Sequence, residues 1–373
     1  MRRPPRDSIA SRPWRHVVAG LLAITLAVPA AAVLGAWSGL YDVAASSGHW
    51  EIVDRFLRFG MEQSVRRRAP DVVPPPLADE DRIGLGAAHY HAGCAYCHGA
   101  PGLPVSPVAG QMLPPPPDLA DRVGRWTDPE LFRLVMHGIK YAGMPAWPAQ
   151  GRDDEVWTVV AFLRRLPQLD AQGYRAIALG DVRIDDETGR QLATRGSGED
   201  AIGACARCHG AGTRGPDNRF VPRLHAQPGA FLARALREYV AGERPSGIMQ
   251  TAAHALPSDA IERVAAYYAG LAAPPASRPP AETGASLDAG RRLASDGDPA
   301  ARVPACLPCH GTDALATYPR LAGQPAAYLA GHLRAWQHGP RARTDADAIM
   351  APIARRLTPR QVDDVSAYFE SLR

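Results

Sequence analysis

Three stretches of the sequence share one spacing of cysteine and histidine. They read Cys94-Ala-Tyr-Cys97-His98, Cys205-Ala-Arg-Cys208-His209 and Cys306-Leu-Pro-Cys309-His310. Together they use all six cysteines of the 373-residue chain, so no cysteine is left for a structural disulfide. Two thiols at positions i and i+3 lie on one face of a helical turn, and the histidine follows directly. The chain therefore presents the same local chemistry three times.

This spacing is typical of covalent haem attachment. Two thiols form thioethers with one porphyrin, and the next histidine binds the iron. A four-thiolate zinc site needs two pairs close together, and here neighbouring pairs are 111 and 101 residues apart. A thioredoxin-like pair belongs in an α/β context, which the sequence does not show. We therefore predict three haem c groups, attached to Cys94, Cys97, Cys205, Cys208, Cys306 and Cys309, with iron bound by His98, His209 and His310.

Methionine is a common second ligand of histidine-bound haem iron. Met249 is the only methionine of the second segment and Met350 the only one of the third, and each lies 40 residues after its histidine. In isolation each would more often fill a hydrophobic core. The equal spacing favours ligation, so both are predicted iron ligands.

The first segment offers three methionines. Met144 lies in a loop-like stretch 46 residues after the histidine and is the predicted ligand. Met136 falls within a predicted helix and is interpreted as core. Met112 precedes a run of prolines on the proximal side, and His137 is a weaker rival at a helix end.

The N-terminal region predicts a membrane anchor. Five arginines lie within residues 1–16, and residues 17–40 follow without a charge. This run of 24 residues exceeds the roughly 20 that span a bilayer and the ~7–15 of a secretory signal core. The basic end is then cytoplasmic. We expect a single-pass protein of the bacterial inner membrane with its haem domains in the periplasm, although Ala30–Ala32 leaves cleavage open as an alternative.

Residues 41–78 are expected to form a juxtamembrane helix and a linker. Apolar residues from Trp50 to Phe59 have helical spacing, and three arginines, Arg66–Arg68, follow. Two interpretations remain open: an amphipathic helix on the membrane surface, or a helix that packs on the first haem domain. The proline-rich stretch Pro70–Pro76 is expected to be a semi-rigid spacer.

The remaining sequence divides into three haem domains, at residues 79–170, 171–273 and 284–373. The last two form an internal repeat: Gly189–Ala193 matches Gly290–Ala294 at an offset of 101, and Pro222–Leu224 matches Pro319–Leu321 at an offset of 97. Duplicated domains give such a pattern. The net charge of +4 is small and gives no reason to expect a nucleic-acid partner.

Each haem domain is predicted to be helical. Amphipathic stretches precede the cysteine pairs (79–91, 186–194 and 285–294). Middle helices follow them (129–137, 230–241 and 326–336), and closing helices end each domain (153–166, 258–271 and 359–372). No domain shows the alternation of a strand. The predicted fold class is all-α.

These motifs resemble class I cytochrome c domains. In the third domain, Cys309–Gly311, Tyr318–Gln324 and Met350–Pro352 resemble the tandem dihaem cytochromes c of the bacterial periplasm, and the second domain is a looser copy. The first domain, with Gly143–Trp147, resembles single-haem cytochrome c subunits fused to respiratory complexes.

The resemblance implies a role for two prolines. Pro222 and Pro319 are expected to supply the carbonyl that accepts the N–H of the proximal histidine. No equivalent is identified in the first domain.

Six-coordinate irons leave no position for a substrate, so the sequence predicts electron transfer and no enzyme activity. A dehydrogenase or quinol–cytochrome c reductase is expected upstream, and a soluble cytochrome or terminal oxidase downstream. One alternative is a cytochrome subunit of a larger periplasmic dehydrogenase. A haem peroxidase would need an open iron, and a haem sensor would normally carry a cytoplasmic output domain.

Overall fold

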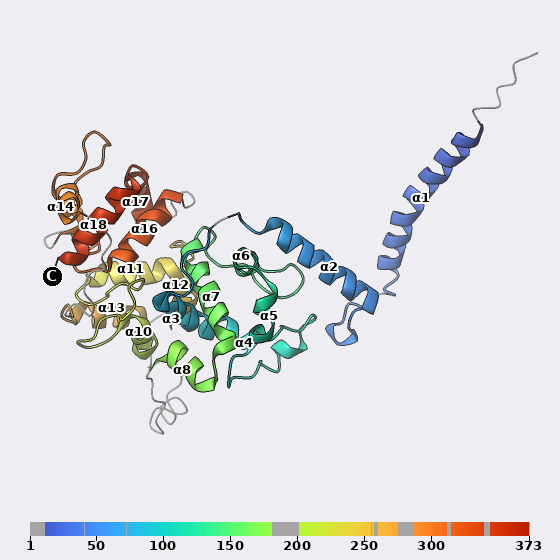
Figure 1. The fold of residues 1–373 in the computed structure, drawn as a ribbon, viewed down its shortest axis with the longest axis horizontal. Coiled ribbons are helices and arrows are strands. Elements are labelled where there is room, and N and C mark those ends of the chain that lie inside the picture. The colour runs from blue at the N-terminus through green and yellow to red at the C-terminus, as the bar shows by residue number, and fades with distance from the viewer. Residues whose placement is uncertain are drawn as a thin grey trace, which may run out of the picture. The chain divides into compact units, whose positions relative to one another are not determined.

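The computed structural model describes residues 12–40, 42–71, 73–180, 201–254, 256, 260–274, 286–311, 315–338 and 344–372. The chain forms two compact units, residues 1–56 and 57–373 (Figure 1). The helix expected at 186–194 lies outside the described residues, as does most of the stretch that joins the second and third domains.

The first unit contains the predicted anchor. Helix α1 spans Arg12–Trp37, and its segment His16–Trp37 is apolar and long enough to cross a membrane. None of that segment is buried inside the protein, which is what an apolar helix surrounded by lipid requires. Pro29 lies inside the helix. Helix α2, Glu51–Arg68, begins in this unit and ends in the second.

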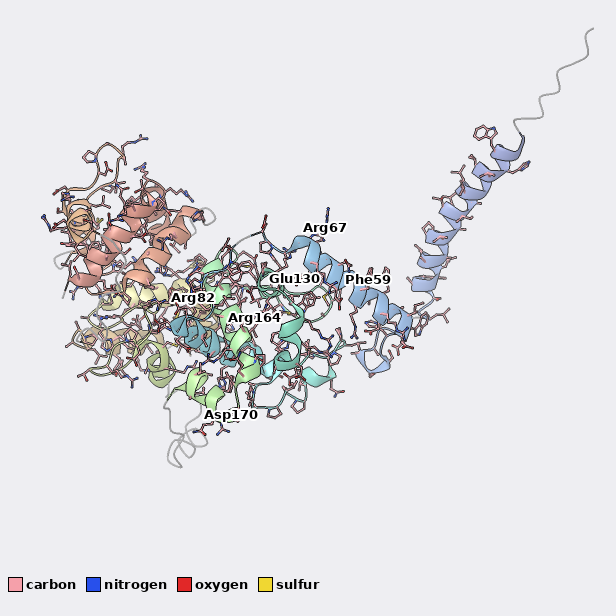
Figure 2. All side chains as sticks on the ribbon, in the orientation of Figure 1. Phe59, Arg67, Arg82, Glu130, Arg164 and Asp170 are labelled. Atoms are coloured by element: carbon pink, nitrogen blue, oxygen red, sulfur yellow. The ribbon has the colours of Figure 1, made fainter. Side chains whose placement is uncertain are left out.

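Helix α2 keeps large apolar side chains in contact with solvent. Ile52, Phe56 and Phe59 follow one another at helical spacing, and all three are mainly exposed. Figure 2 labels Phe59 together with Arg67 of the basic last turn. The expected helix is therefore confirmed, and the two interpretations of its apolar side stay open.

The second unit is also helical. Its longer helices are α3 (Glu80–His89), α6 (Asp128–His137), α7 (Asp153–Arg165), α8 (Ala171–Leu179), α10 (Ala201–His209), α11 (Gly229–Val240), α12 (Gly247–His254), α13 (Ala260–Gly270), α14 (Leu287–Asp296), α16 (Ala326–His338), α17 (Asp345–Ala354) and α18 (Pro359–Ser371). Short helices are α4 (Ala95–His98), α5 (Leu119–Arg122) and α15 (Leu307–His310). In the described residues only isolated β-bridges occur, so the all-α prediction is confirmed.

Three hydrophobic cores lie in this unit, one around each cysteine pair. In the first, α3 crosses α7, with α6 and α8 packed beside them. The second joins α11 to α13, and the third joins α14 and α16 to α18. The helices before the motif and at the domain end therefore pack together in the first and third domains, as their amphipathic patterns require.

Helix α8 follows the domain boundary expected near residue 170, yet it packs on α3 of the first core. Tyr174 is fully buried, and its ring meets Tyr90 edge-on at 6.5 Å between centroids. Its hydroxyl lies 2.9 Å from Nδ1 of His91, just before the first cysteine. The first core thus extends to the end of α8.

A glycine sets the distance between crossing helices in two of the cores. A Cβ at Gly86 would lie 2.0 Å from the Thr158 carbonyl oxygen of α7, and one at Gly290 would lie 2.1 Å from the Asp364 carbonyl oxygen of α18. Only glycine lets the two helix backbones approach this closely. The equivalent placement in the first and third domains reflects one shared packing scheme.

Replacing Gly86 by alanine is expected to lower the free energy of unfolding by about 1–3 kcal/mol, because α3 and α7 must move apart. Gly84→Ala on the same helix is the control: nothing lies within 4 Å of its added Cβ. It should raise stability by up to about 1 kcal/mol through helix propensity. Urea unfolding of the detergent-solubilised chain measures both, and equal effects would contradict the crossing argument.

Candidate haem-binding sites

Each histidine of the three motifs is held by the carbonyl of a proline. The Nδ1 atoms of His98, His209 and His310 lie 2.9 Å from the carbonyl oxygens of Pro117, Pro222 and Pro319, respectively. The last two are the prolines that the resemblance named. Pro117 supplies the counterpart in the first domain, which sequence reasoning did not find.

This bond fixes the chemistry of the imidazole. A carbonyl only accepts, so Nδ1 carries the proton and Nε2 keeps a free lone pair. Burial lowers the pKa of all three histidines, against a smaller opposing effect of the proline carbonyl. Each ring is therefore neutral at pH 7 and presents Nε2 as a metal ligand.

The residue after the histidine also has a defined role in two domains. Gly99 and Gly210 both have a left-handed backbone, with φ of 65° and 73°. The carbonyl of each accepts a hydrogen bond from a buried tyrosine: Tyr90 at 2.7 Å in the first domain and Tyr268 at 2.8 Å in the second. These bonds tie the attachment turn to the core.

The first thiol of each pair lies in apolar surroundings. Burial raises the pKa of Cys94 to about 12, and those of Cys205 and Cys306 to about 11. None of the six cysteines forms a disulfide. Both thiols of each pair can therefore form thioether bonds, which a disulfide between them would prevent.

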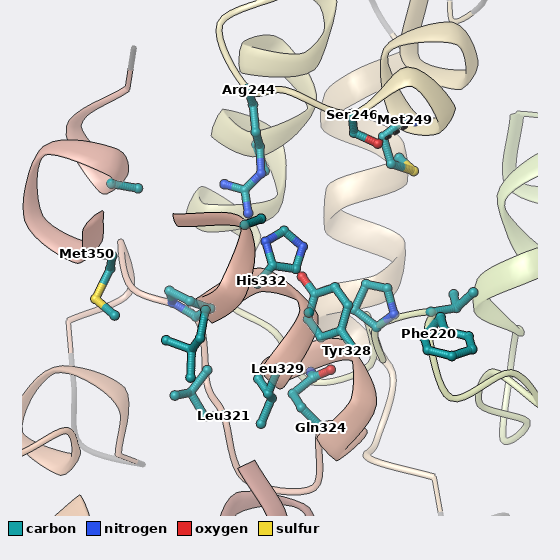
Figure 3. Close-up of a pocket in the computed structure, with 18 of the residues that line it drawn as sticks. Phe220, Arg244, Ser246, Met249, Leu321, Gln324, Tyr328, Leu329, His332 and Met350 are labelled. Carbon is teal, nitrogen blue, oxygen red and sulfur yellow. Dashed lines mark hydrogen bonds between the residues drawn. The ribbon is translucent and has the colours of Figure 1, made fainter. Parts of the chain in front are cut away.

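A cavity of about 1340 Å³ joins the second and third sites. Its lining includes both members of each cysteine pair, both histidines, Met249 and Met350. Figure 3 shows Met249 and Met350 on opposite sides of this cavity, with Tyr328 and His332 of α16 between them. Thiols, a neutral imidazole and a thioether around one mainly apolar cavity are the donor set that haem c requires, so these residues fit the group.

The same cavity has a buried basic part that the sequence did not reveal. Arg152 and Arg244 both line it, and Figure 3 shows Arg244 directed toward His332. Burial, and then these two guanidinium groups, lower the pKa of His332 to about 3. The Arg244 guanidinium lies 3.5 Å from the Glu238 carboxylate. Buried guanidinium groups suit the acidic side chains of a haem.

The predicted methionine ligands lie in different local structures. Met249 is on α12 and Met350 on α17. Met144 does lie in a loop, between α6 and α7, where its carbonyl accepts the Ile139 N–H at 3.1 Å. Met136 is buried in the first core, as interpreted.

Met112 lies next to the Met144 loop. A Cβ added to Gly143 would be 1.9 Å from the Met112 methyl carbon, so Met112 packs directly over that glycine. The structure thus places the Met112 side chain against the loop that carries Met144. His137 is exposed at the end of α6, which agrees with a helix-end role.

Two glutamines connect the second and third sites reciprocally. Gln227 donates to the Arg320 carbonyl at 2.8 Å and accepts its N–H at 3.0 Å. Gln324 does the same with Arg223, at 2.8 and 3.0 Å. Both arginines directly follow the prolines that hold the proximal histidines, so the domain interface is built on the proximal loops. Sequence reasoning missed this role, and the matched positions of the two glutamines within the repeat were the available signal.

Family comparisons agree with this geometry. The family described as cytochrome C oxidase, cbb3-type, subunit III, matches residues 81–163, and the family described as cytochrome c matches residues 288–373. Helical domains that present Cys-x-x-Cys-His around a carbonyl-held histidine define the chain as a c-type cytochrome, and the two matched domains imply haem c.

Three relatives narrow the assignment. The thiosulfate dehydrogenase electron acceptor of Thiomonas intermedia (strain K12) is 36% identical over 169 residues, 44% of this chain and 76% of that protein. The protein of the same name from Stutzerimonas stutzeri (strain A1501) is 34% identical over 187 residues, 49% of this chain and 86% of that protein. Cytochrome c4 of Stutzerimonas stutzeri is 28% identical over 190 residues, 47% of this chain and 88% of that protein. The chain belongs to the cytochrome c family that contains these proteins, and it is an electron carrier.

Replacing Gln324 by leucine should loosen the interface between the second and third domains, because it leaves a backbone N–H and a carbonyl of Arg223 unpaired. We expect the Arg223 amide to exchange with deuterium roughly tenfold faster or more. Gln337→Leu is the matched control, since Gln337 donates to the Ala354 and Leu357 carbonyls of its own domain. Faster Arg223 exchange in the control as well would contradict a specific interface role.

The stability of the first domain is expected to depend on pH through His89. Its ring packs against the Trp147 ring with the centroids 4.6 Å apart, and burial lowers its pKa to about 4. Between pH 6.5 and 4 the unfolded chain therefore binds a proton that the folded chain does not. The free energy of unfolding should fall by about 2 kcal/mol from pH 7 to pH 5 through this residue. In urea unfolding, His89→Phe should lose this contribution of about 2 kcal/mol to the fall in the free energy of unfolding. An unchanged pH dependence would refute the role of His89.

Proposed function

We propose that this chain is a membrane-anchored relay with three covalently bound haem c groups. Cys94 with Cys97, Cys205 with Cys208, and Cys306 with Cys309 attach the haems. Each iron is bound by a histidine and a methionine: His98 with Met144, His209 with Met249, and His310 with Met350. With both axial positions filled, the irons change oxidation state and bind no substrate.

One observation carries this proposal. The imidazole–proline contact recurs at 2.9 Å in all three domains, although the proline lies 19, 13 and 9 residues after its histidine. Three different loops converge on one geometry, the one that leaves Nε2 free for iron. A thiol-redox role would not require this contact.

Ion pairs and hydrogen bonds join the three haem domains to one another. Arg219 of the second domain forms ion pairs with Asp79 and Asp81 of the first, and the latter pair measures 2.7 Å. Arg219 and Arg82 both lie over the ring of Phe220, at 4.7 and 4.8 Å. The glutamine pairs described above join the second domain to the third. Fixed contacts keep the separations between sites constant, which a relay needs.

The electron donor we infer is a periplasmic dehydrogenase that oxidises thiosulfate. This inference rests on the two relatives named as thiosulfate dehydrogenase electron acceptors. A soluble cytochrome or a terminal oxidase would accept the electrons. A role as a cytochrome subunit of a larger dehydrogenase is compatible with the same contacts, because the relay would be unchanged.

Helix α1 would hold the relay in the inner membrane, with the haem domains in the periplasm. The support is its length and apolar surface, together with the basic residues that precede it. Carbonate extraction of membranes tests this directly: an anchored chain stays with the lipid, and a cleaved chain is released.

Single Met→Ala replacements test the ligand assignment. The reduced wild-type protein should bind no carbon monoxide, because no iron is open. Met144→Ala, Met249→Ala and Met350→Ala should each make one haem of three bind carbon monoxide and lower its midpoint potential. Visible spectra and a redox titration measure both. Met112→Ala is the control for the first domain and should leave its haem closed. If Met112→Ala opens this haem and Met144→Ala does not, Met112 is the ligand in place of Met144. Carbon monoxide binding by the wild type would instead favour the peroxidase or sensor alternative.

The donor is tested by mixing the oxidised protein with purified thiosulfate dehydrogenase and thiosulfate. All three haems should be reduced, and omitting either the enzyme or thiosulfate should abolish the reduction. Reduction by a quinol–cytochrome c reductase alone, with none by the dehydrogenase, would replace the inferred donor and leave the relay proposal intact.

A further inference from the structure

The helix that carries Met249 begins at a carboxylate from another domain. Ser246 precedes α12, and its hydroxyl accepts the Met249 N–H at 3.0 Å. The same hydroxyl donates to Oε1 of Glu155 at 2.5 Å, and the Gly247 N–H donates to Oε2 at 2.7 Å. Glu155 lies in the first turn of α7, in the first haem domain. Two of the otherwise unpaired N–H groups of α12 are thus satisfied, one of them across the domain boundary.

Glu155 is firmly placed for this contact. The residue is only 4% exposed. Trp147 Nε1 donates to Oε2 at 3.2 Å, and the Arg152 guanidinium lies 3.0 Å from Oε1. Arg152 also donates to the Pro245 carbonyl at 2.9 Å, just before α12. The first domain therefore holds both the carboxylate and the chain that leads into α12.

The first domain packs tightly against the first residue of α12. A Cβ on Gly247 would lie 2.3 Å from the Trp147 ring, so the indole rests directly on the first residue of α12. Trp147 in turn follows Met144 by three residues in the loop of the first domain. The two methionine-bearing segments are thus in contact through one indole ring. Figure 3 shows Ser246 beside Met249 at this helix start.

In the third domain, the helix that carries Met350 is capped by residues of the same domain. Helix α17 starts with a capping box in which Thr344 accepts the Asp347 N–H at 3.1 Å and Asp347 accepts the Thr344 N–H at 3.1 Å. Met350 follows in the same helix. The second domain has Ser246 at its helix start, but the carboxylate comes from Glu155, 91 residues earlier in the chain. The two repeats therefore differ in where the helix cap originates.

We infer that Glu155 is a positioning residue for the axial ligand of the second haem, and that the first domain completes the ligand helix of the second. A carboxylate at a helix N-terminus stabilises the helix through its unpaired N–H groups and its dipole. Without it, α12 loses its fixed start and Met249 its fixed position. This inference rests on the proposed ligation of the second iron by Met249.

The coordination of the second haem iron therefore depends on the first domain. The second iron is closed by Met249 only while the first domain is docked through Glu155, whereas the third iron is closed by its own domain. Any partner that separates the first two domains would thereby open one haem and lower its potential.

The test uses carbon monoxide binding to the reduced full chain in detergent. Glu155→Ala and Ser246→Ala should each shift the equilibrium between the closed and the open second haem roughly tenfold toward the open form, the size of a lost helix cap. The shift should appear as carbon monoxide binding that the wild type lacks. Ser246→Ala leaves Glu155 and Arg152 in place, so it remains informative if Glu155→Ala folds poorly. Asp364→Asn is the matched control: this buried carboxylate accepts the Ser286 N–H at the start of α14, a helix that carries no predicted iron ligand. It should leave all haems closed.

Double variants identify the haem involved. Glu155→Ala combined with Met249→Ala should bind no more carbon monoxide than Met249→Ala alone, because both act on the same iron. Binding at a second haem in the double variant would overturn the inference. So would closed haems in both Glu155→Ala and Ser246→Ala while Met249→Ala opens one. If Met249→Ala itself binds none, the proposed ligand is wrong, and the failure belongs to the proposed function.

Discussion

The hydrogen bond between each proximal imidazole and a proline carbonyl is the interaction on which the rest of the structure depends. It selects the tautomer that leaves Nε2 free, and it fixes where each ring lies relative to its cysteine pair. A loop that must deliver this carbonyl cannot move freely. In the second and third domains the residue after the proline, Arg223 or Arg320, therefore has a fixed backbone position. A glutamine of the other domain bonds this backbone in each case. Domain assembly and haem-site geometry share the same loops.

The opposite side of each site is less uniform. The predicted ligand is on a loop in the first domain, on a self-capped helix in the third, and on a helix capped by a neighbouring domain in the second. A methionine side chain is flexible, so its position depends on how firmly its backbone is held. The first two domains share that support through Glu155 and Trp147. The internal repeat has thus kept its proximal geometry and differs in how the helix of the predicted methionine ligand is capped.

Much of this organisation is visible in the sequence because it is local. Attachment needs two thiols and a histidine within five residues, and the amphipathic helices show their period within ten to fifteen. The predicted middle and closing helices appear within two residues of their expected ends, for example 129–137 against Asp128–His137. Helices α12 and α17 were missed as helices, because segments of eight and ten residues with mixed composition show little periodicity. The packing of α8 on the first core was missed as well, since Tyr174 finds His91 only in three dimensions.

The sequence by itself determined the all-α class, the number of attachment motifs, the three histidines and the spacing of two methionines, because these follow from covalent chemistry and helical periodicity. Only the tertiary structure decided that Pro117 serves His98, that Gln227 and Gln324 bond each other's domains, and that Glu155 caps the helix of Met249. These are contacts between polar groups far apart in the chain. A lone glutamine or glutamate carries no periodic signal, and its partner exists only once the domains have packed.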